Sequence, residues 1–150
     1  MFCKKKKKKG SFVAPKREID RVFVHCSASS NPKHGDVEVI RDWHKQRGWS
    51  DIGYHFFIPF DGKLQKGRGL EKTPAAQKGH NVGTIAICLH GLEKDDFTPE
   101  QFETVKNLCN DINHVISDVT FHGHCEVSAK ACPVFDYKEV LNLNQFGEIE

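Results

Sequence analysis

The sequence has no long apolar run: no segment approaches the about 18 consecutive apolar residues that a membrane-spanning helix needs. It also lacks a Cys-x-x-Cys pair, the spacing typical of zinc fingers, and it contains no internal repeat. These absences argue against an integral membrane protein, a zinc finger and a repeat array. A single globular domain remains, since 150 residues with 38% hydrophobic and 28% charged content can bury one core.

The net charge of +2 conceals an uneven distribution, because six consecutive lysines run from Lys4 to Lys9. Without these six charges the chain would carry −4. Blocks of like charge are usually solvated, so residues 1–18 are expected to form a flexible basic leader, and residues 19–150 the folded domain. Alternatively, the lysines contact an anionic envelope polymer or membrane surface. No apolar segment of about 7–15 residues follows them, so we expect no secretory signal peptide.

Six cysteines raise the question of disulfide bonds. A chain of this length and apolar content does not need such bonds, and without an export signal we expect free thiols. Cys88 and Cys109 fall on apolar faces of a predicted strand and helix. Cys26 follows His25 in a predicted strand and should point to the opposite face of the sheet. These three cysteines are interpreted as core residues.

The hydrophobic pattern predicts five strands and three helices. The expected strands are residues 22–25, 54–60, 63–66, 84–89 and 119–122, with a tight Asp61-Gly62 turn between the second and third. Helices are expected after three N-cap residues: Asp36, Thr98 with a capping box to Gln101, and Asp136. Because strands and helices are interleaved, we predict an α/β single domain with a central mixed β-sheet flanked by helices.

Three residues are candidates for a metal centre: His25, His124 and Cys132. His25 closes a buried strand, His124 follows the last strand, and Cys132 lies eight residues further on in an irregular loop. A catalytic zinc site needs three protein ligands of such types and an open position for water. Spacing alone does not show that the three meet. A histidine at a strand end is commonly a hydrogen-bonded structural residue, and a lone cysteine is commonly a small apolar one.

Three separated blocks of the sequence resemble the zinc-dependent N-acetylmuramoyl-L-alanine amidases, a family that includes amidase-type phage lysozymes and peptidoglycan recognition proteins. The blocks are residues 24–29 (Val-His-Cys-Ser-Ala-Ser), residues 51–56 (Asp-Ile-Gly-Tyr-His-Phe) and residues 124–133, which end in Lys-Ala-Cys-Pro. Their order and spacing match the family from about residue 20 to residue 138. Shorter matches occur at Trp43-His44, Gly48-Trp49, Asp61-Gly62 and residues 81–89.

The resemblance implies one zinc ion per chain in a surface groove, with His25, His124 and Cys132 as ligands. It implies that Tyr54 and Lys130 are catalytic residues and that Asn81 contacts substrate. The reaction would be hydrolysis of the amide bond between N-acetylmuramic acid and the L-alanine of the stem peptide.

Zinc lowers the pKa of bound water from about 15.7 to about 7 and polarises the carbonyl group. Lys130 and the Tyr54 hydroxyl would stabilise the oxyanion of the tetrahedral intermediate. Tyr54 is also the first candidate to accept the proton of water, directly or through a second water, and Glu126 is the second.

Three positions depart from the family pattern or complicate it. Many relatives have a groove-lining histidine where this chain has Ala76, which would remove a substrate contact. Cys125 directly follows His124 and is either a bystander or an oxidation-sensitive thiol. His122, two residues before His124, is a competing candidate ligand.

Two rival functions remain open: a non-catalytic peptidoglycan-binding or regulatory protein of the same fold, and a cysteine hydrolase with Cys132 as nucleophile. Cys132, Tyr54 and Lys130 are all present, which favours zinc catalysis. The expected setting is a phage endolysin, made in the host bacterial cytoplasm before it reaches the cell wall; a bacterial recycling or wall-remodelling enzyme is the alternative. We expect a monomer that binds bacterial peptidoglycan, with no nucleic-acid partner and no transmembrane segment.

Overall fold

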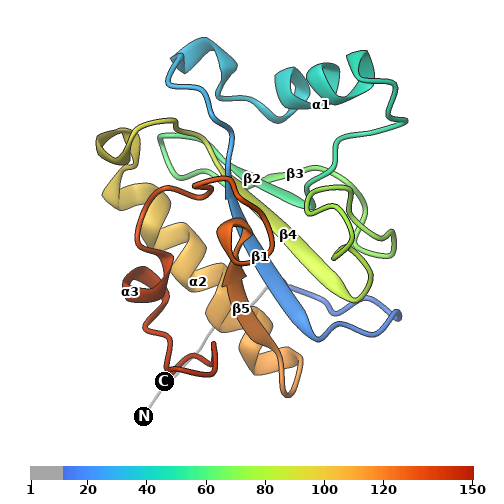
Figure 1. Cartoon of the computed structure of the whole chain (residues 1–150), viewed down its shortest axis with the longest axis vertical. Coiled ribbons are helices and arrows are strands. Elements are labelled where there is room, and N and C mark those ends of the chain that lie inside the picture. The colour runs from blue at the N-terminus through green and yellow to red at the C-terminus, as the bar shows by residue number, and fades with distance from the viewer. Residues whose placement is uncertain (1–11) are drawn as a thin grey trace.

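The computed structural model describes residues 12–150, in which helices flank a central β-sheet (Figure 1). The lysines from Lys4 to Lys9, which were expected to belong to a flexible leader, lie outside the described residues. The strands are β1 (Arg21–Cys26), β2 (Phe56–Ile58), β3 (Gln65–Lys66), β4 (Thr84–Leu89) and β5 (Thr120–Gly123). The α-helices are α1 (Val37–Gln46), α2 (Pro99–Val115) and α3 (Tyr137–Leu141), and three short 3-10 helices are η1 (Pro32–His34), η2 (Lys94–Asp96) and η3 (His124–Glu126).

The five strands form one mixed sheet in the order β3-β2-β4-β1-β5. β1 pairs in parallel with both β4 and β5, β2 pairs in parallel with β4, and only the short β3 runs antiparallel, to β2. The α/β class and the mixed sheet with flanking helices are therefore confirmed. Since β1 and β5 are parallel neighbours, their carboxyl ends lie together, and His25 and His124 both belong to that edge of the sheet.

Strand alternation divides the core into two parts. Val22, Val24 and Cys26 of β1 point toward α2 and α3, in the larger cluster that also contains the apolar face of α2. On the opposite face, Cys88 of β4 packs with α1 in a smaller cluster. His25 is paired in register with Cys88, so it also belongs to the α1 side of the sheet.

The helix ends follow local sequence rules. The Thr98 hydroxyl accepts a hydrogen bond from the Gln101 N–H, and the Gln101 side chain accepts one from the Thr98 N–H, which is the predicted capping box. Asp36 and Asp136 cap α1 and α3 through their carboxylates. Gly48 lies just past the end of α1 with a φ of +91°, a conformation that suits glycine.

Several expected boundaries differ from the structure; the strand expected at residues 63–66, for example, covers only Gln65–Lys66. The strand expected at residues 54–60 is shorter, since β2 covers Phe56–Ile58 and Tyr54 lies in the preceding loop. Within residues 12–18, Phe12 is only 8% exposed and packs into the larger core cluster. The Arg17 guanidinium donates to the carbonyl oxygens of Leu70 and Thr84. Part of the segment expected to be leader thus contacts the folded domain.

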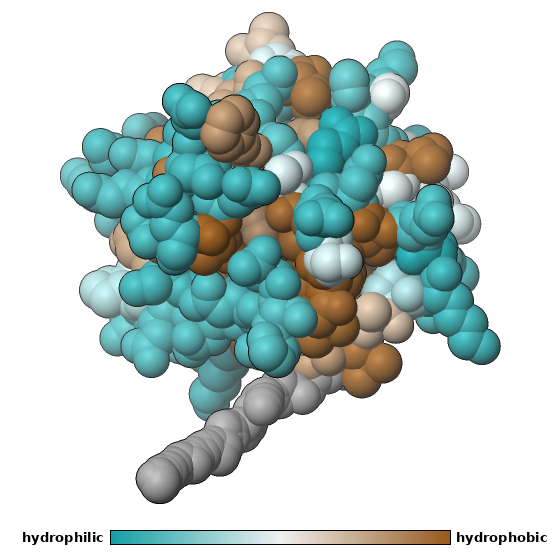
Figure 2. Space-filling view, turned by 90° about the horizontal axis from the view of Figure 1, so that it is seen from below, coloured by the Kyte–Doolittle hydropathy of each residue, from teal (hydrophilic) through white to brown (hydrophobic). Residues whose placement is uncertain are grey.

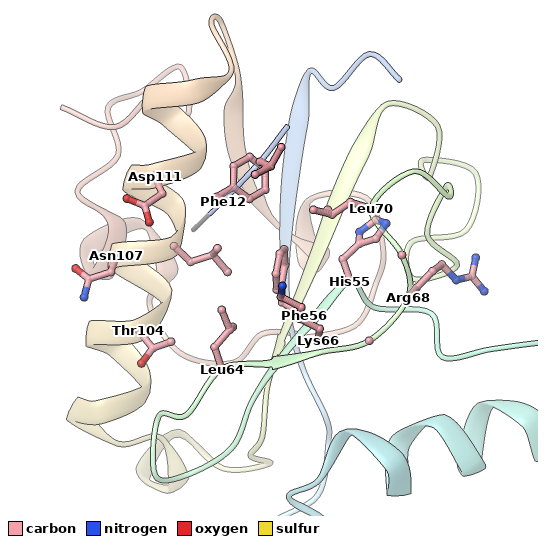
Figure 3. Close-up of a pocket in the computed structure, with 14 residues that line it drawn as sticks. Phe12, His55, Phe56, Leu64, Lys66, Arg68, Leu70, Thr104, Asn107 and Asp111 are labelled. Carbon is pink, nitrogen blue, oxygen red and sulfur yellow. The ribbon is translucent and has the colours of Figure 1, made fainter. Parts of the chain in front are cut away.

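A cavity of about 530 Å³ lies between α2 and the β2–β3 edge of the sheet. Thr104, Asn107 and Asp111 border it from α2, and the Arg68 side chain points away from it (Figure 3). Seen from below, the molecular surface is largely hydrophilic, with hydrophobic atoms gathered toward the middle of the view (Figure 2). Among residues 12–150, no helix has the length and apolar character required to cross a membrane.

Candidate metal centre

His25, His124 and Cys132 converge at the carboxyl edge of the sheet, as the resemblance to the family implied. His25 is the fifth residue of β1, His124 opens η3 directly after β5, and Cys132 lies in the loop that follows. One donor atom from each of the three lies within 4.8 Å of the other two. The imidazole rings of His25 and His124 have centroids 4.6 Å apart, and the Cys132 Sγ lies 3.8 Å from the His25 Nδ1.

The spacing and chemistry of these donors fit a metal ion. A tetrahedral ion with bonds of about 2.0–2.3 Å holds its donors about 3.3–3.8 Å apart, which is close to the separation of His25 Nδ1 and Cys132 Sγ. Two imidazole nitrogens and one sulfur are borderline to soft donors, which suit transition metals rather than calcium or magnesium. Three protein donors leave further coordination positions for water or substrate. The cluster can therefore bind a metal.

Burial keeps the two imidazoles in the neutral form that binds metals. Burial, together with the nearby His124 and Lys130, lowers the pKa of His25 to about 3. Burial also lowers the pKa of His124, again with a contribution from Lys130. The hydrogen bond with Cys26 and burial both raise the pKa of Cys132, so its thiolate requires a neighbouring cation. A metal ion in the cluster would supply that cation.

The two expected catalytic residues lie beside the cluster. The Tyr54 ring centroid is 5.1 Å from that of His25. Burial raises the pKa of Tyr54 well above its ordinary value, so the hydroxyl is protonated and can donate a hydrogen bond. Lys130 is exposed, and it is close enough to His25 and His124 to affect the pKa of both.

A groove of about 950 Å³ runs past the cluster. α1 and the segment after it line one part of the groove, and the end of β1 and the loops around residues 75–81 and 124–134 line much of the rest. Residues that line it include Tyr54, Lys130, Ala76, Asn81, Trp43, Trp49, Lys78, His124 and Cys132. The donor cluster is therefore open to this groove through His124 and Cys132.

Asn81 lines the groove and also stabilises the backbone of a neighbouring loop. Its side-chain oxygen accepts hydrogen bonds from the backbone N–H groups of Ala76 and Gln77, at 3.0 and 2.9 Å. Asn81 thus fixes the loop that forms this wall of the groove. The methyl group of Ala76 lines the groove where many relatives are expected to have histidine.

His122 and Glu126 are engaged with each other rather than with the cluster. The His122 Nδ1 lies 2.8 Å from a Glu126 carboxylate oxygen, and its Nε2 lies 2.7 Å from the Thr120 hydroxyl. The Glu126 carboxylate also accepts hydrogen bonds from the Gly123 N–H and the Tyr137 hydroxyl. These hydrogen bonds of Glu126 therefore stabilise the turn that contains His124.

Every cysteine within residues 12–150 is free, as expected. Cys88 and Cys109 are fully buried, and Cys125 is exposed. Cys26 is buried in the larger core cluster, but its backbone N–H also donates to the Cys132 Sγ at 3.1 Å. Its position beside the donor cluster was not predicted, because it depends on the loop that carries Cys132.

One buried residue of the site was missed altogether. The Gln77 side chain is fully buried, and its Oε1 lies 2.8 Å from the His25 Nε2. A glutamine between Ala76 and Lys78 in an irregular segment gives no signal of such a role in the sequence. The contact arises only because the loop folds back over β1.

Comparisons with known proteins agree with this geometry. A sequence profile of the family described as N-acetylmuramoyl-L-alanine amidase matches residues 15–135. The endolysin of Escherichia phage T7 is 36% identical over 136 residues, covering 87% of this chain and 90% of the relative. The endolysin of Klebsiella phage KP32 is 34% identical with the same coverage.

Among solved structures, the N-acetylmuramoyl-L-alanine amidase LysC from Clostridium intestinale superposes with a TM-score of 0.76 and 27% sequence identity. The match covers 85% of this chain and 88% of that protein.

Proposed function

Since the chain belongs to the N-acetylmuramoyl-L-alanine amidase family and is a peptidoglycan amidase, we propose that His25, His124 and Cys132 bind one zinc ion for this reaction. The observation that carries the proposal is the convergence of the three donors within 4.8 Å at an open groove. Zinc binds well to neutral imidazole nitrogens and to thiolate sulfur. Its filled d shell imposes no coordination geometry, so it can adopt the arrangement that these three donors provide.

The bound zinc would lower the pKa of water and polarise the scissile carbonyl group. The chain's own residues would orient the substrate and stabilise developing charge. The exposed ammonium group of Lys130 reaches the groove beside the two histidines, where it can approach an oxyanion. The hydroxyl of Tyr54, whose ring centroid lies 5.1 Å from that of His25, is proposed to donate a second hydrogen bond to the same oxyanion.

Asn81 and Lys78 line the same groove and are proposed to contact the glycan or stem peptide. Asn81 would act with its side-chain N–H group, because its oxygen is engaged by Ala76 and Gln77. We also propose that residues 19–150 are the amidase catalytic domain, and that the lysines from Lys4 to Lys9 attract the anionic envelope.

In the proposed setting the chain is a monomeric phage endolysin, present in the host bacterial cytoplasm before it reaches the wall. The support is that the two relatives above are endolysins of phages and match most of this chain. A wall-remodelling or recycling enzyme of a bacterium would share the reaction but not the phage context.

Mass analysis of digested peptidoglycan tests the reaction directly. The expected products are intact glycan strands and free stem peptides that begin with L-alanine. Cleaved glycan strands would point to a different kind of lysin. Binding without any cleavage would favour the non-catalytic alternative.

Chelation tests the metal. Activity should be lost with o-phenanthroline and recovered on addition of Zn²⁺. A cysteine hydrolase with Cys132 as nucleophile would instead resist the chelator and be inactivated by iodoacetamide. Elemental analysis should find one zinc per chain.

A further inference from the structure

The imidazole of His25 has two nitrogens in different surroundings. Its Nδ1 faces the donor cluster, 3.8 Å from the Cys132 Sγ. Its Nε2 faces away and lies 2.8 Å from the Gln77 Oε1. His25 is 1% exposed and Gln77 is 0% exposed, so water does not compete for this contact. The Gln77 amide can face His25 with either its oxygen or its NH₂ group, and this choice determines which nitrogen of His25 carries the proton.

The orientation of the Gln77 amide follows from its other contacts. Its Nε2 lies 2.7 Å from the Thr84 hydroxyl oxygen and 3.3 Å from the His80 carbonyl oxygen. The Thr84 hydroxyl donates its own proton to the Asn81 carbonyl oxygen at 2.8 Å, so toward Gln77 it can only accept. The amide NH₂ group must therefore face Thr84, and the amide oxygen must face His25.

The backbone of Gln77 is held as firmly as its side chain. Its N–H donates to the Asn81 side-chain oxygen at 2.9 Å, and its carbonyl oxygen accepts from the His80 N–H at 2.8 Å. Thr84 itself is fully buried at the start of β4. The contact with His25 is thus built into the loop between residues 76 and 84.

We propose that Gln77 is a positioning residue that holds His25 in the Nε2-protonated tautomer, with the Nδ1 lone pair directed at the metal. An acceptor fixed at 2.8 Å requires a donor on Nε2, which leaves Nδ1 as the unprotonated nitrogen. The same contact fixes the rotation of the ring. The inference rests on the proposed function, because it assigns the nitrogen with which His25 binds the zinc ion.

The proposal is tested by zinc affinity, measured by competition with a chromophoric chelator. Gln77→Leu keeps the volume of the side chain but removes the acceptor, and should weaken zinc binding about 10–100-fold, the usual effect of losing such a partner. Gln77→Glu restores an acceptor toward Nε2 and should recover most of that loss. Gln101→Leu is the matched control, since Gln101 is equally buried but donates to the Ile58 and His90 carbonyl oxygens, away from the cluster. It should leave zinc affinity unchanged.

A second readout uses the unmodified chain and does not depend on any variant folding. The ¹⁵N NMR spectrum of the His25 ring, with and without zinc, should show a protonated Nε2 in both states. An Nδ1-protonated ring in the zinc-free protein would overturn the proposal. A folded Gln77→Leu variant that binds zinc as tightly as the parent would overturn it as well. If the parent chain itself bound no zinc, the proposed function would fail instead, so the two failures are distinguishable.

Discussion

Gly53 and Ala75 approach each other so closely that no side chain fits between them. A Cβ atom placed on Gly53 would lie 2.1 Å from the Ala75 carbonyl oxygen and 3.1 Å from the Trp49 ring. The two backbones are also joined by a hydrogen bond from the Ala75 N–H to the Gly53 carbonyl oxygen, at 3.1 Å. Since Trp49 and Ala75 both line the groove, this contact helps to shape the site.

We therefore expect Gly53→Ala to destabilise the protein by roughly 3 kcal/mol, because the clash is with backbone that cannot rotate away. Urea unfolding measures the change. Gly69→Ala is the control, since a Cβ atom there would meet nothing within 4 Å, and its effect should stay within about 0.5 kcal/mol. Equal stability of the two variants would show that Gly53 and the Ala75 carbonyl group do not lie as close together as the structure indicates.

The Asp51 carboxylate should make stability depend on pH. It accepts hydrogen bonds from the Arg41 Nε at 2.8 Å and the Ile52 N–H at 2.7 Å. Burial opposes ionisation, but these two donors outweigh it and hold the pKa of Asp51 below its ordinary 3.8. Because the pKa of Asp51 is lower in the folded state than in the unfolded state, its ionised carboxylate stabilises the fold at any pH above the unfolded-state pKa. This stabilisation is lost as the pH falls through the folded-state pKa.

Asp51→Asn should therefore cost about 1 kcal/mol of unfolding free energy at pH 7, and the difference from the parent should shrink below about pH 4. Urea unfolding at a series of pH values provides the test. Asp42→Asn, at an exposed position on α1 next to Arg41, is the control and should change stability little at pH 7. A parent–variant difference for Asp51→Asn that grows on acidification would show that the sign is wrong.

The parts of the fold that could be predicted are those that local sequence determines. The capping box of Thr98 and Gln101 and the carboxylate cap at Asp36 depend on residues within three positions of each other. The convergence of His25 with His124 was predicted from the resemblance to the family. It is realised because β1 and β5 are parallel neighbours.

The parts that could not be predicted depend on loops that fold back onto the sheet. Gln77 reaches His25 across 52 positions, and the Cys26 N–H donates to the Cys132 Sγ across 106. Phe12 lies in the expected leader but packs into the core. None of these residues carries a local pattern that reveals its partner.

Lys130→Ala is expected to leave folding and zinc binding intact but to lower kcat by about 10²–10³, the usual effect of losing an oxyanion donor. Turnover of purified peptidoglycan and zinc content would be measured together. Lys78→Ala removes a positive charge from the same groove and serves as the control, with a much smaller loss of kcat. A fall in zinc content as large as that of His25→Ala would contradict the role assigned to Lys130.

Tyr54→Phe keeps the aromatic ring against His25 but removes the hydroxyl group. We expect turnover to be lost while sedimentation with insoluble peptidoglycan is retained, because the ring still lines the groove. Normal turnover by this variant would remove Tyr54 from the mechanism.

Cys132→Ser should lose both zinc and activity, because a serine hydroxyl replaces the thiolate in the donor cluster and is a far poorer zinc ligand. Cys125→Ser tests whether the effect is specific, since Cys125 lies in the same loop region, is exposed and stands outside the cluster. The Cys125 N–H donates to the Cys132 carbonyl oxygen at 2.7 Å, and this backbone contact survives either substitution. Metal analysis of both purified variants should therefore find zinc only in Cys125→Ser. Full zinc content in Cys132→Ser would mean that the ion is held elsewhere.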